Sequence, residues 1–370
     1  MTPPWAGVFP ARTLADRLAT TGGRPSGFDY MRLALALSVI GWHSLIISYG
    51  QDASPGPGQQ LLAPLSLLIV PMFFSLSGFL VAGSLERSWS LFNFLGLRVF
   101  RIMPALSVEV LLSALVLGPM VTTLGVRAYF AAPELHSYML NIVGDIHYSL
   151  PGVFQGNPTT LVNGQLWTVP YELVCYVVLA LLAVAGVVRR RHLLLAFLCV
   201  YYAAQVGNTL LRPSTAFQGA GGSSIVMAFL AGLLLFRYRD RIAWSPLLFA
   251  AMLAAAVALP MYMPKGMRFA AVPIAYVTVY LGLLNPTRNR LVLSGDYSYG
   301  LFLYGFPVQQ AVHASSPIFR EWWSNLLVAI PCTAAVAVAS WWLVEKPVLQ
   351  QRDKLKLAEA WCLRAVRTVR

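Results

Sequence analysis

Long apolar segments separated by short polar ones dominate the sequence. Their pattern predicts helices at roughly 28–49, 61–84, 104–126, 166–188, 193–211, 223–236, 245–263, 269–285, 297–314 and 322–343. At a rise of about 1.5 Å per residue, about 20 residues cross a hydrocarbon layer of about 30 Å. The sequence therefore predicts an all-α fold, a polytopic membrane bundle of about ten transmembrane helices.

The segments between these helices differ in character. Residues 51–60 form a turn-rich loop without Lys or Arg, and residues 127–165 form the longest loop. Residues 86–103 mix aromatic side chains with arginines, which is typical of a helix lying in the inner membrane interface. Pro104 is well placed for the first turn of a helix, so we expect the third transmembrane helix to begin there.

Composition and charge support the membrane interpretation. The chain has 370 residues, 58% hydrophobic and 11% charged, whereas soluble domains carry about 25% charged residues. The net charge of +13 comes from short basic clusters between apolar runs, which favours the positive-inside pattern and excludes a single nucleic-acid-binding patch. Only five of the 27 Lys and Arg fall in the proposed outer loops: Arg127, Arg212, Lys265, Arg268 and Arg320. We therefore expect both termini in the cytoplasm.

The same pattern predicts three parts of the chain. Residues 1–27 form a mobile cytoplasmic arm, 28–348 the membrane domain, and 349–370 a basic amphipathic cytoplasmic tail that can lie on anionic membrane lipids. The four cysteines are scattered without metal-ligand spacing, so we expect neither a disulfide framework nor a metal site.

The helix at 28–49 carries Asp29 and Arg32 at its start and His43 deep inside. Eleven residues separate Arg32 from His43, close to three turns, so both leave the same helix face about 16 Å apart along the axis. His43 is either a packed core histidine or part of a reaction centre. Ionisable groups inside a membrane are costly and often functional, which favours the second interpretation.

Two arginines follow the second helix. Arg98 and Arg101 lie three residues apart and share a helix face. Two guanidinium groups on one face can bind phosphates bidentately. Alternatively, both arginines serve only as positive-inside anchors.

The segment Asn163–Tyr176 contains a second group of candidates. Trp167 is suited to anchoring at the interface, and Glu172 lies just inside a helix start, where the dipole favours a carboxylate. Glu172 is either a solvated interfacial charge or a group that activates a hydroxyl or pairs with a cation. Glu109 in the third helix has the same two interpretations. His136 and His147 in the long outer loop either contact an external substrate or, as is usual for loop histidines, are only solvated, and we favour the second interpretation.

Several motifs occur in a set order on these helices. They are Arg32 followed after ten residues by His43, FFSLSGFL at 73–80, Arg98-x-x-Arg101 followed by Pro104, LWTVPYE at 166–172, SYGLFLYGFP at 298–307, and Glu345-Lys346-Pro347. In this order the sequence resembles acyltransferase family 3, integral-membrane proteins that O-acylate bacterial polysaccharides, lipopolysaccharide and nodulation factors. The resemblance covers about residues 28–348.

The resemblance implies roles for individual residues. His43 would be the catalytic base or acyl relay, with Glu172 as a second catalytic residue. Arg32, Arg98 and Arg101 would bind the acyl-CoA donor. Beyond the resemblance, we expect supporting roles for Asp29, Ser75, Ser77, Trp167 and Tyr299, with the two serines polarising the thioester carbonyl. Many members carry a histidine where this chain has Gly305, so His43 would act without that partner.

The resemblance also implies substrates and a location. Acetyl-CoA or another acyl-CoA would be the donor substrate, with no permanently bound cofactor, and the acceptor would be a hydroxyl of a cell-surface or lipid-linked glycan. The protein would lie in the bacterial inner membrane. The alternative is a transporter or flippase that moves a sugar, lipid or acyl intermediate without covalent chemistry, since polar groups within Pro-broken helices suit that function too.

Overall fold

The computed structural model describes residues 13–50, 57–88, 90–211, 221–263, 265–355, 357 and 359. Within these residues the secondary structure is helical, apart from isolated bridges that join Thr13 to Ala243 and Thr122 to Val153. The predicted all-α class is therefore confirmed. The chain forms two compact units, and each is described by itself.

Unit 1 contains the described residues within Met1–Leu35, Pro57–Arg87 and Val177–Leu293. Its elements are α1 (Leu14–Ala19), the start of α2 (Gly27–Tyr49), α3 (Pro57–Ser88), the end of α8 (Val169–Val184), α9 (Arg191–Leu211), α10 (Gly222–Arg237), α11 (Pro246–Tyr262), η4 (Gly266–Arg268), α12 (Ala271–Gly282) and α13 (Arg290–Ser294). α12 packs against α10 and α11. Residues 13–27, expected as a mobile arm, include α1, whose Leu14 is fully buried.

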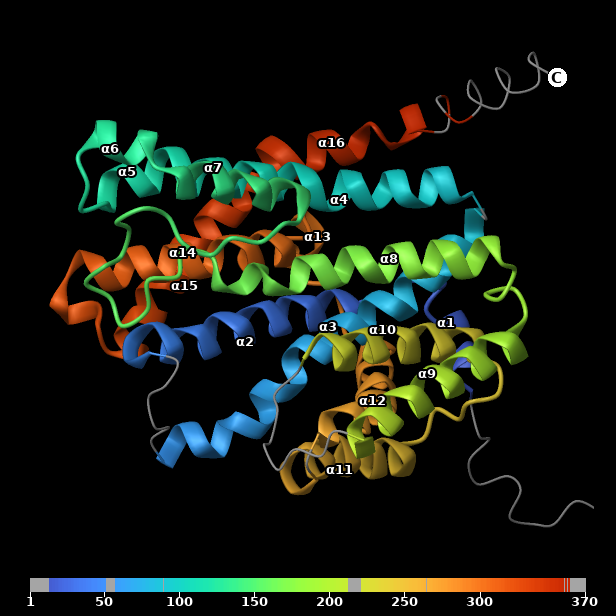
Figure 1. Cartoon of the computed structure of the whole chain (residues 1–370). Helices are drawn as coiled ribbons and strands as arrows, with labels where there is room; N and C mark the ends of the chain where they lie inside the picture. The colour runs from blue at the N-terminus through green and yellow to red at the C-terminus, as the bar shows by residue number, and fades with distance from the viewer. Residues whose placement is uncertain are drawn as a thin grey trace, which may run out of the picture. The chain divides into compact units, whose positions relative to one another are not determined.

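Unit 2 contains the described residues within Ala36–Gly56, Ser88–Tyr176 and Ser294–Arg370. It holds the rest of α2 and α8 together with α4 (Leu91–Leu112), η1 (Ser113–Leu117), α5 (Gly118–Val121), α6 (Val126–Ala131), α7 (Pro133–Met139), η2 (Leu140–Val143), η3 (Gly164–Thr168), α14 (Ser298–Ser315), η5 (Pro317–Phe319), α15 (Trp322–Ser340), η6 (Trp341–Glu345) and α16 (Lys346–Gln350). α14 and α15 pack along each other, as Figure 1 shows in orange.

Five helices of the described chain are long and apolar enough to cross a membrane. They are Gly27–Tyr49, Leu65–Arg87, Leu91–Val121, Gly164–Val184 and Trp322–Leu355. Shorter apolar helices are found at Gly222–Arg237, Pro246–Tyr262 and Ala271–Gly282. The chain is thus a multi-pass membrane protein, whereas the number ten and the cytoplasmic position of both termini stay predictions.

The predicted helix start at Pro104 is wrong. α4 begins at Leu91, where the Ser90 side chain accepts a hydrogen bond from the backbone N–H of Asn93, and continues through Pro104 to Leu112. An internal proline removes only one backbone hydrogen bond, and helices in membranes tolerate that loss. Arg98 and Arg101 consequently lie on one long helix rather than on a separate interfacial one.

Two further boundaries differ from the prediction. The expected loop at 127–165 contains the short helices α6, α7 and η2. The last predicted helix, 322–343, does not end before Glu345-Lys346-Pro347, because the π-helical segment η6 connects α15 directly to α16. A π-helix shifts the helical register and often occurs at functional sites.

Candidate active site

His43 packs edge-on against an aromatic ring of α14. The centroids of the His43 and Phe306 rings lie 5.0 Å apart, with an interplanar angle of 75°. Two neighbouring residues of α14 explain this approach. A Cβ on Gly305 would lie 3.0 Å from Cγ1 of Ile40, and Gln309 Nε2 donates a hydrogen bond of 2.9 Å to the Ile40 carbonyl. Gly305 thus provides close helix packing between α14 and α2.

The ring nitrogens of His43 form no hydrogen bond with another residue that the structure describes. His43 is half-buried within a helix of membrane-spanning length. The contact with the Phe306 ring is therefore the described contact that orients its imidazole.

The segment that precedes α8 supports Phe306 from the other side. A Cβ on Gly164 would lie 2.7 Å from the Phe306 ring, so only glycine allows this contact without displacing a neighbour. Gln165 Nε2 donates a hydrogen bond of 2.6 Å to the Leu303 carbonyl in the same helix. Both contacts fix one turn of α14 next to His43.

Glu109 is fully buried in a polar cluster with Asn163. Its carboxylate accepts hydrogen bonds from Ser113 Oγ (2.7 Å) and from Asn163 Nδ2 (3.0 Å). Asn163 Nδ2 also donates to the Tyr138 hydroxyl. Glu109 is therefore not a solvated charge, and it anchors the segment that contacts Phe306.

Tyr129 fixes the π-helical segment that follows Glu109. Its hydroxyl donates a hydrogen bond of 2.7 Å to the Ala114 carbonyl in η1. Burial raises the pKa of Tyr129 to about 12, so the hydroxyl keeps its proton at neutral pH. The short helix α6 is thereby held against the end of the long α4 segment.

Arg98 and Arg101 have different surroundings. Arg101 forms ion pairs with Asp296 (2.8 Å) and Glu345 (3.2 Å). Arg98 lies over the rings of Phe94 and Tyr176, at 5.8 Å from each centroid, and its Nε has no hydrogen-bond partner among the described residues.

Glu172 lies in the same unit as the two arginines. Its carboxylate accepts a hydrogen bond of 2.5 Å from the Tyr176 hydroxyl and interacts electrostatically with Arg98 and Arg101. Of the two supporting aromatic residues, Trp167 packs against Tyr171, with ring centroids 6.1 Å apart. Tyr299 donates a hydrogen bond of 3.0 Å to the Ile102 carbonyl.

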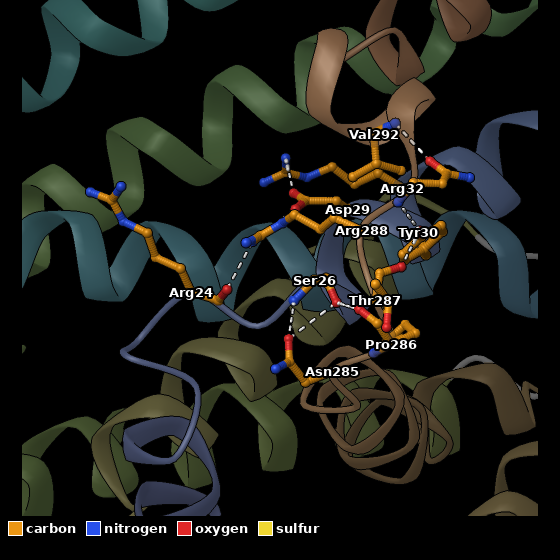
Figure 2. A network of polar contacts seen from close by, with 11 residues as sticks. Arg24, Ser26, Asp29, Tyr30, Arg32, Asn285, Pro286, Thr287, Arg288 and Val292 are labelled. Carbon is orange, nitrogen blue, oxygen red and sulfur yellow. Dashed lines mark hydrogen bonds and ion pairs between the residues drawn. The ribbon is translucent and has the colours of Figure 1, made fainter.

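The candidates of unit 1 lie in two places. Figure 2 shows Asp29 between two guanidinium groups, 3.9 Å from Arg32 and 3.4 Å from Arg288. Ser26 and Tyr30 hydrogen-bond to the loop 285–287, which holds this loop against the start of α2. Ser75 and Ser77 lie in α3, and the Ser75 side chain is fully buried.

The loop histidines have local partners. His136 Nδ1 lies 3.2 Å from the Ala132 carbonyl, and the His147 backbone N–H donates to Asn141 Oδ1. Within the described chain, no group of three or more His, Cys, Asp or Glu has the arrangement of a metal site.

Sequence reasoning did not select four residues that organise this region: Asn163, Gln165, Asp296 and Glu345. The two amides directly precede the apolar run of α8, and their position among turn residues was the available signal. Glu345 belongs to the Glu-Lys-Pro motif, but its partner Arg101 is 244 positions away, and no local pattern reveals such a pair.

The sequence matches a known family of membrane enzymes. The family model for the acyltransferase domain of acyltransferase family 3 matches residues 26–345. The chain belongs to this family and is a membrane O-acyltransferase.

Two relatives align over nearly their full length. The chain is 25% identical over 341 residues to an O-acetyl transferase of Shigella phage Sf6, covering 89% of this chain and 98% of the relative. It is 27% identical over 365 residues to nodulation protein 10 of Rhizobium leguminosarum bv. viciae, covering 90% of this chain and 96% of the relative. No solved structure shows significant similarity to the chain.

Proposed function

We propose that the protein transfers an acetyl group from acetyl-CoA to a hydroxyl of a cell-surface or lipid-linked glycan, with His43 at the reacting centre. One observation carries this proposal: an imidazole inside a helix of membrane-spanning length is oriented by Phe306 and has no hydrogen-bonding partner among the described residues. The name of the phage relative supports an acetyl group as the group transferred.

The proposed reaction needs one base. The acceptor hydroxyl oxygen attacks the thioester carbonyl while a ring nitrogen of His43 takes the hydroxyl proton. A carbon–oxygen bond forms, the carbon–sulfur bond breaks, and the CoA thiolate takes up a proton as it leaves. In the second route a ring nitrogen of His43 attacks the thioester carbonyl, so that a carbon–nitrogen bond forms, the carbon–sulfur bond breaks and the CoA thiolate leaves. The hydroxyl oxygen then attacks the acyl group, the carbon–nitrogen bond breaks, and the hydroxyl proton passes to the released imidazole nitrogen or to the CoA thiolate.

The donor phosphates are proposed to bind Arg98. Its guanidinium forms no ion pair within 4 Å with a described carboxylate, and its Nε lacks a hydrogen-bond partner there. A phosphate can provide both an ion pair with the guanidinium and a hydrogen-bond acceptor for Nε. Arg32 is proposed to act on the same donor, and Glu172 to assist the acceptor hydroxyl. The site is proposed to work in the bacterial inner membrane, among membrane lipids and without bound metal.

Purified protein, radiolabelled acetyl-CoA and a glycan extract test this function in detergent. We expect label on the glycan with the wild type and with the control His136→Ala, and none with His43→Ala. A transporter cannot give this result, because detergent leaves no second compartment. Label transfer that is equal in His43→Ala and wild type would contradict the role of His43.

The donor site has its own test. Replacing Arg98 with alanine should raise the apparent KM for acetyl-CoA about tenfold, the effect expected for losing one charge-assisted hydrogen bond. A change confined to the KM of the glycan acceptor would contradict this role.

A further inference from the structure

Arg101 has both ends of its guanidinium engaged by carboxylates. Nη2 contacts Asp296 and Nη1 contacts Glu345, whose side chain is only 2% exposed. The guanidinium also lies over the Tyr299 ring, 5.3 Å from its centroid. A phosphate would have to displace a buried carboxylate from Arg101, and breaking a buried pair is costly.

The partners of Arg101 come from two other parts of unit 2. Asp296 directly precedes α14 and accepts a hydrogen bond of 2.6 Å from Ser298 Oγ in its first turn. Glu345 ends η6 and accepts a hydrogen bond of 3.3 Å from Ser340 Oγ. Arg101 therefore joins α4 to the start of α14 and to the end of η6.

Two further hydrogen bonds set the rotation of α14 about its axis. Tyr299 donates to the Ile102 carbonyl of α4, and the Tyr304 hydroxyl donates to Ser340 Oγ at 3.1 Å. Tyr299 and Phe306 are seven residues apart, close to two turns, so they share one face of the helix. Fixing Tyr299 against α4 consequently fixes the direction in which Phe306 meets His43.

We propose that Arg101 is a positioning residue that acts through Asp296, Glu345 and Tyr299 to hold Phe306 against His43, and that it does not bind the donor phosphates. This inference rests on the proposed function and separates the two arginines of the Arg-x-x-Arg motif. Arg98 binds the donor, and Arg101 orients the reacting centre.

The variant Glu345→Gln tests this assignment, because it removes one carboxylate and leaves the pair between Arg101 and Asp296 in place. We expect kcat to fall about tenfold, which corresponds to ~1.4 kcal/mol of additional activation free energy. The Kd for CoA should stay within about twofold of the wild-type value. Arg98→Gln should instead weaken CoA binding about tenfold. Lys346→Gln, which removes the neighbouring charge, is the matched control and should change neither quantity.

A second readout does not depend on the donor. We expect diethyl pyrocarbonate to modify His43 several-fold faster in Glu345→Gln, as measured by peptide mass spectrometry, because Phe306 no longer covers the ring. His147 in the same digest is the internal control. Tyr299→Phe lacks only the hydroxyl bonded to Ile102 and retains Arg101 and both its carboxylates. In this variant too, His43 should be modified faster than in the wild type.

The outcomes separate the inference from the proposed function. Wild-type protein that neither binds CoA nor transfers label would contradict the proposed function. If the wild type is active, the proposed function stands, and either of two results would overturn the inference. One is that Arg101→Gln weakens CoA binding as much as Arg98→Gln does. The other is that Glu345→Gln leaves both kcat and the rate of His43 modification unchanged.

Discussion

At the scale of single residues, the geometry of the candidate site depends on the residues that pack around His43 and Phe306. Gly305 lets α14 approach Ile40 of α2, and Gly164 lets the segment before α8 approach the Phe306 ring. A larger residue at either glycine would separate the groups that orient the imidazole. The absence of a second histidine at position 305 is therefore a packing feature of this chain.

Introducing that histidine should lower activity. In Gly305→His the new side chain meets Cγ1 of Ile40, from a Cβ position only 3.0 Å away. Overpacking of this kind costs about 1–3 kcal/mol and moves neighbouring groups. We expect at least several-fold less label transfer in the detergent assay, and activity at or above the wild-type level would contradict the packing role of Gly305.

Part of this site is predictable from sequence. His43 and Glu172 stand out because ionisable residues are rare in apolar runs, and Arg98 and Arg101 because their spacing puts both on one helix face. Their partners do not stand out, since Asp296 and Glu345 follow Arg101 by 195 and 244 positions. Pairing across such separations depends on tertiary packing, which no local pattern encodes.

At the scale of elements, glycines decide how closely helices approach. A Cβ on Gly78 of α3 would lie 2.0 Å from the Phe229 carbonyl oxygen of α10, and one on Gly232 would lie 2.1 Å from the Ser75 carbonyl oxygen. The two backbones thus touch at a reciprocal crossing, as small residues allow in membranes. The small residues of FFSLSGFL allow this close contact.

Gly78→Ala should destabilise this crossing. Backbone atoms cannot rotate away as a side chain can, so we expect a loss of about 1–3 kcal/mol and a lower unfolding temperature in detergent. Gly207→Ala in α9 is the control, because its Cβ would meet nothing within 4 Å. An unfolding temperature for Gly78→Ala equal to that of Gly207→Ala would contradict the account of this crossing.

Helix boundaries were predictable where apolar runs end at turn residues. The run at 28–49 corresponds to Gly27–Tyr49, and the run at 193–211 to Arg191–Leu211. The prediction was wrong at Pro104 because arginines suggested an interfacial segment. The carboxylate partners of Arg101, which are distant in sequence, allow α4 to continue instead.

At the scale of the whole molecule, the distribution of Lys and Arg predicts the orientation of the protein in the membrane. The clusters at Arg189–Arg191 and at Arg237, Arg239 and Arg241 are predicted to face the cytoplasm. Figure 1 shows the helices that connect these segments, α9 and α10.

Cysteine labelling in intact cells can measure this orientation. In a variant without the four native cysteines, Glu134→Cys should react with a membrane-impermeant maleimide, because residue 134 is exposed in the proposed outer segment. Arg241→Cys should react only after the cells are permeabilised. The reverse pattern would contradict the predicted topology.

Glycan O-acetylation in cells that produce His43→Ala tests the central claim most directly. The wild type, His136→Ala and His43→Ala should be compared at equal amounts in the membrane, with the surface polysaccharide analysed by mass spectrometry. We predict that acetyl groups disappear from the polysaccharide only with His43→Ala. Normal acetylation with His43→Ala at equal membrane levels would contradict the assignment of His43 to the reacting centre.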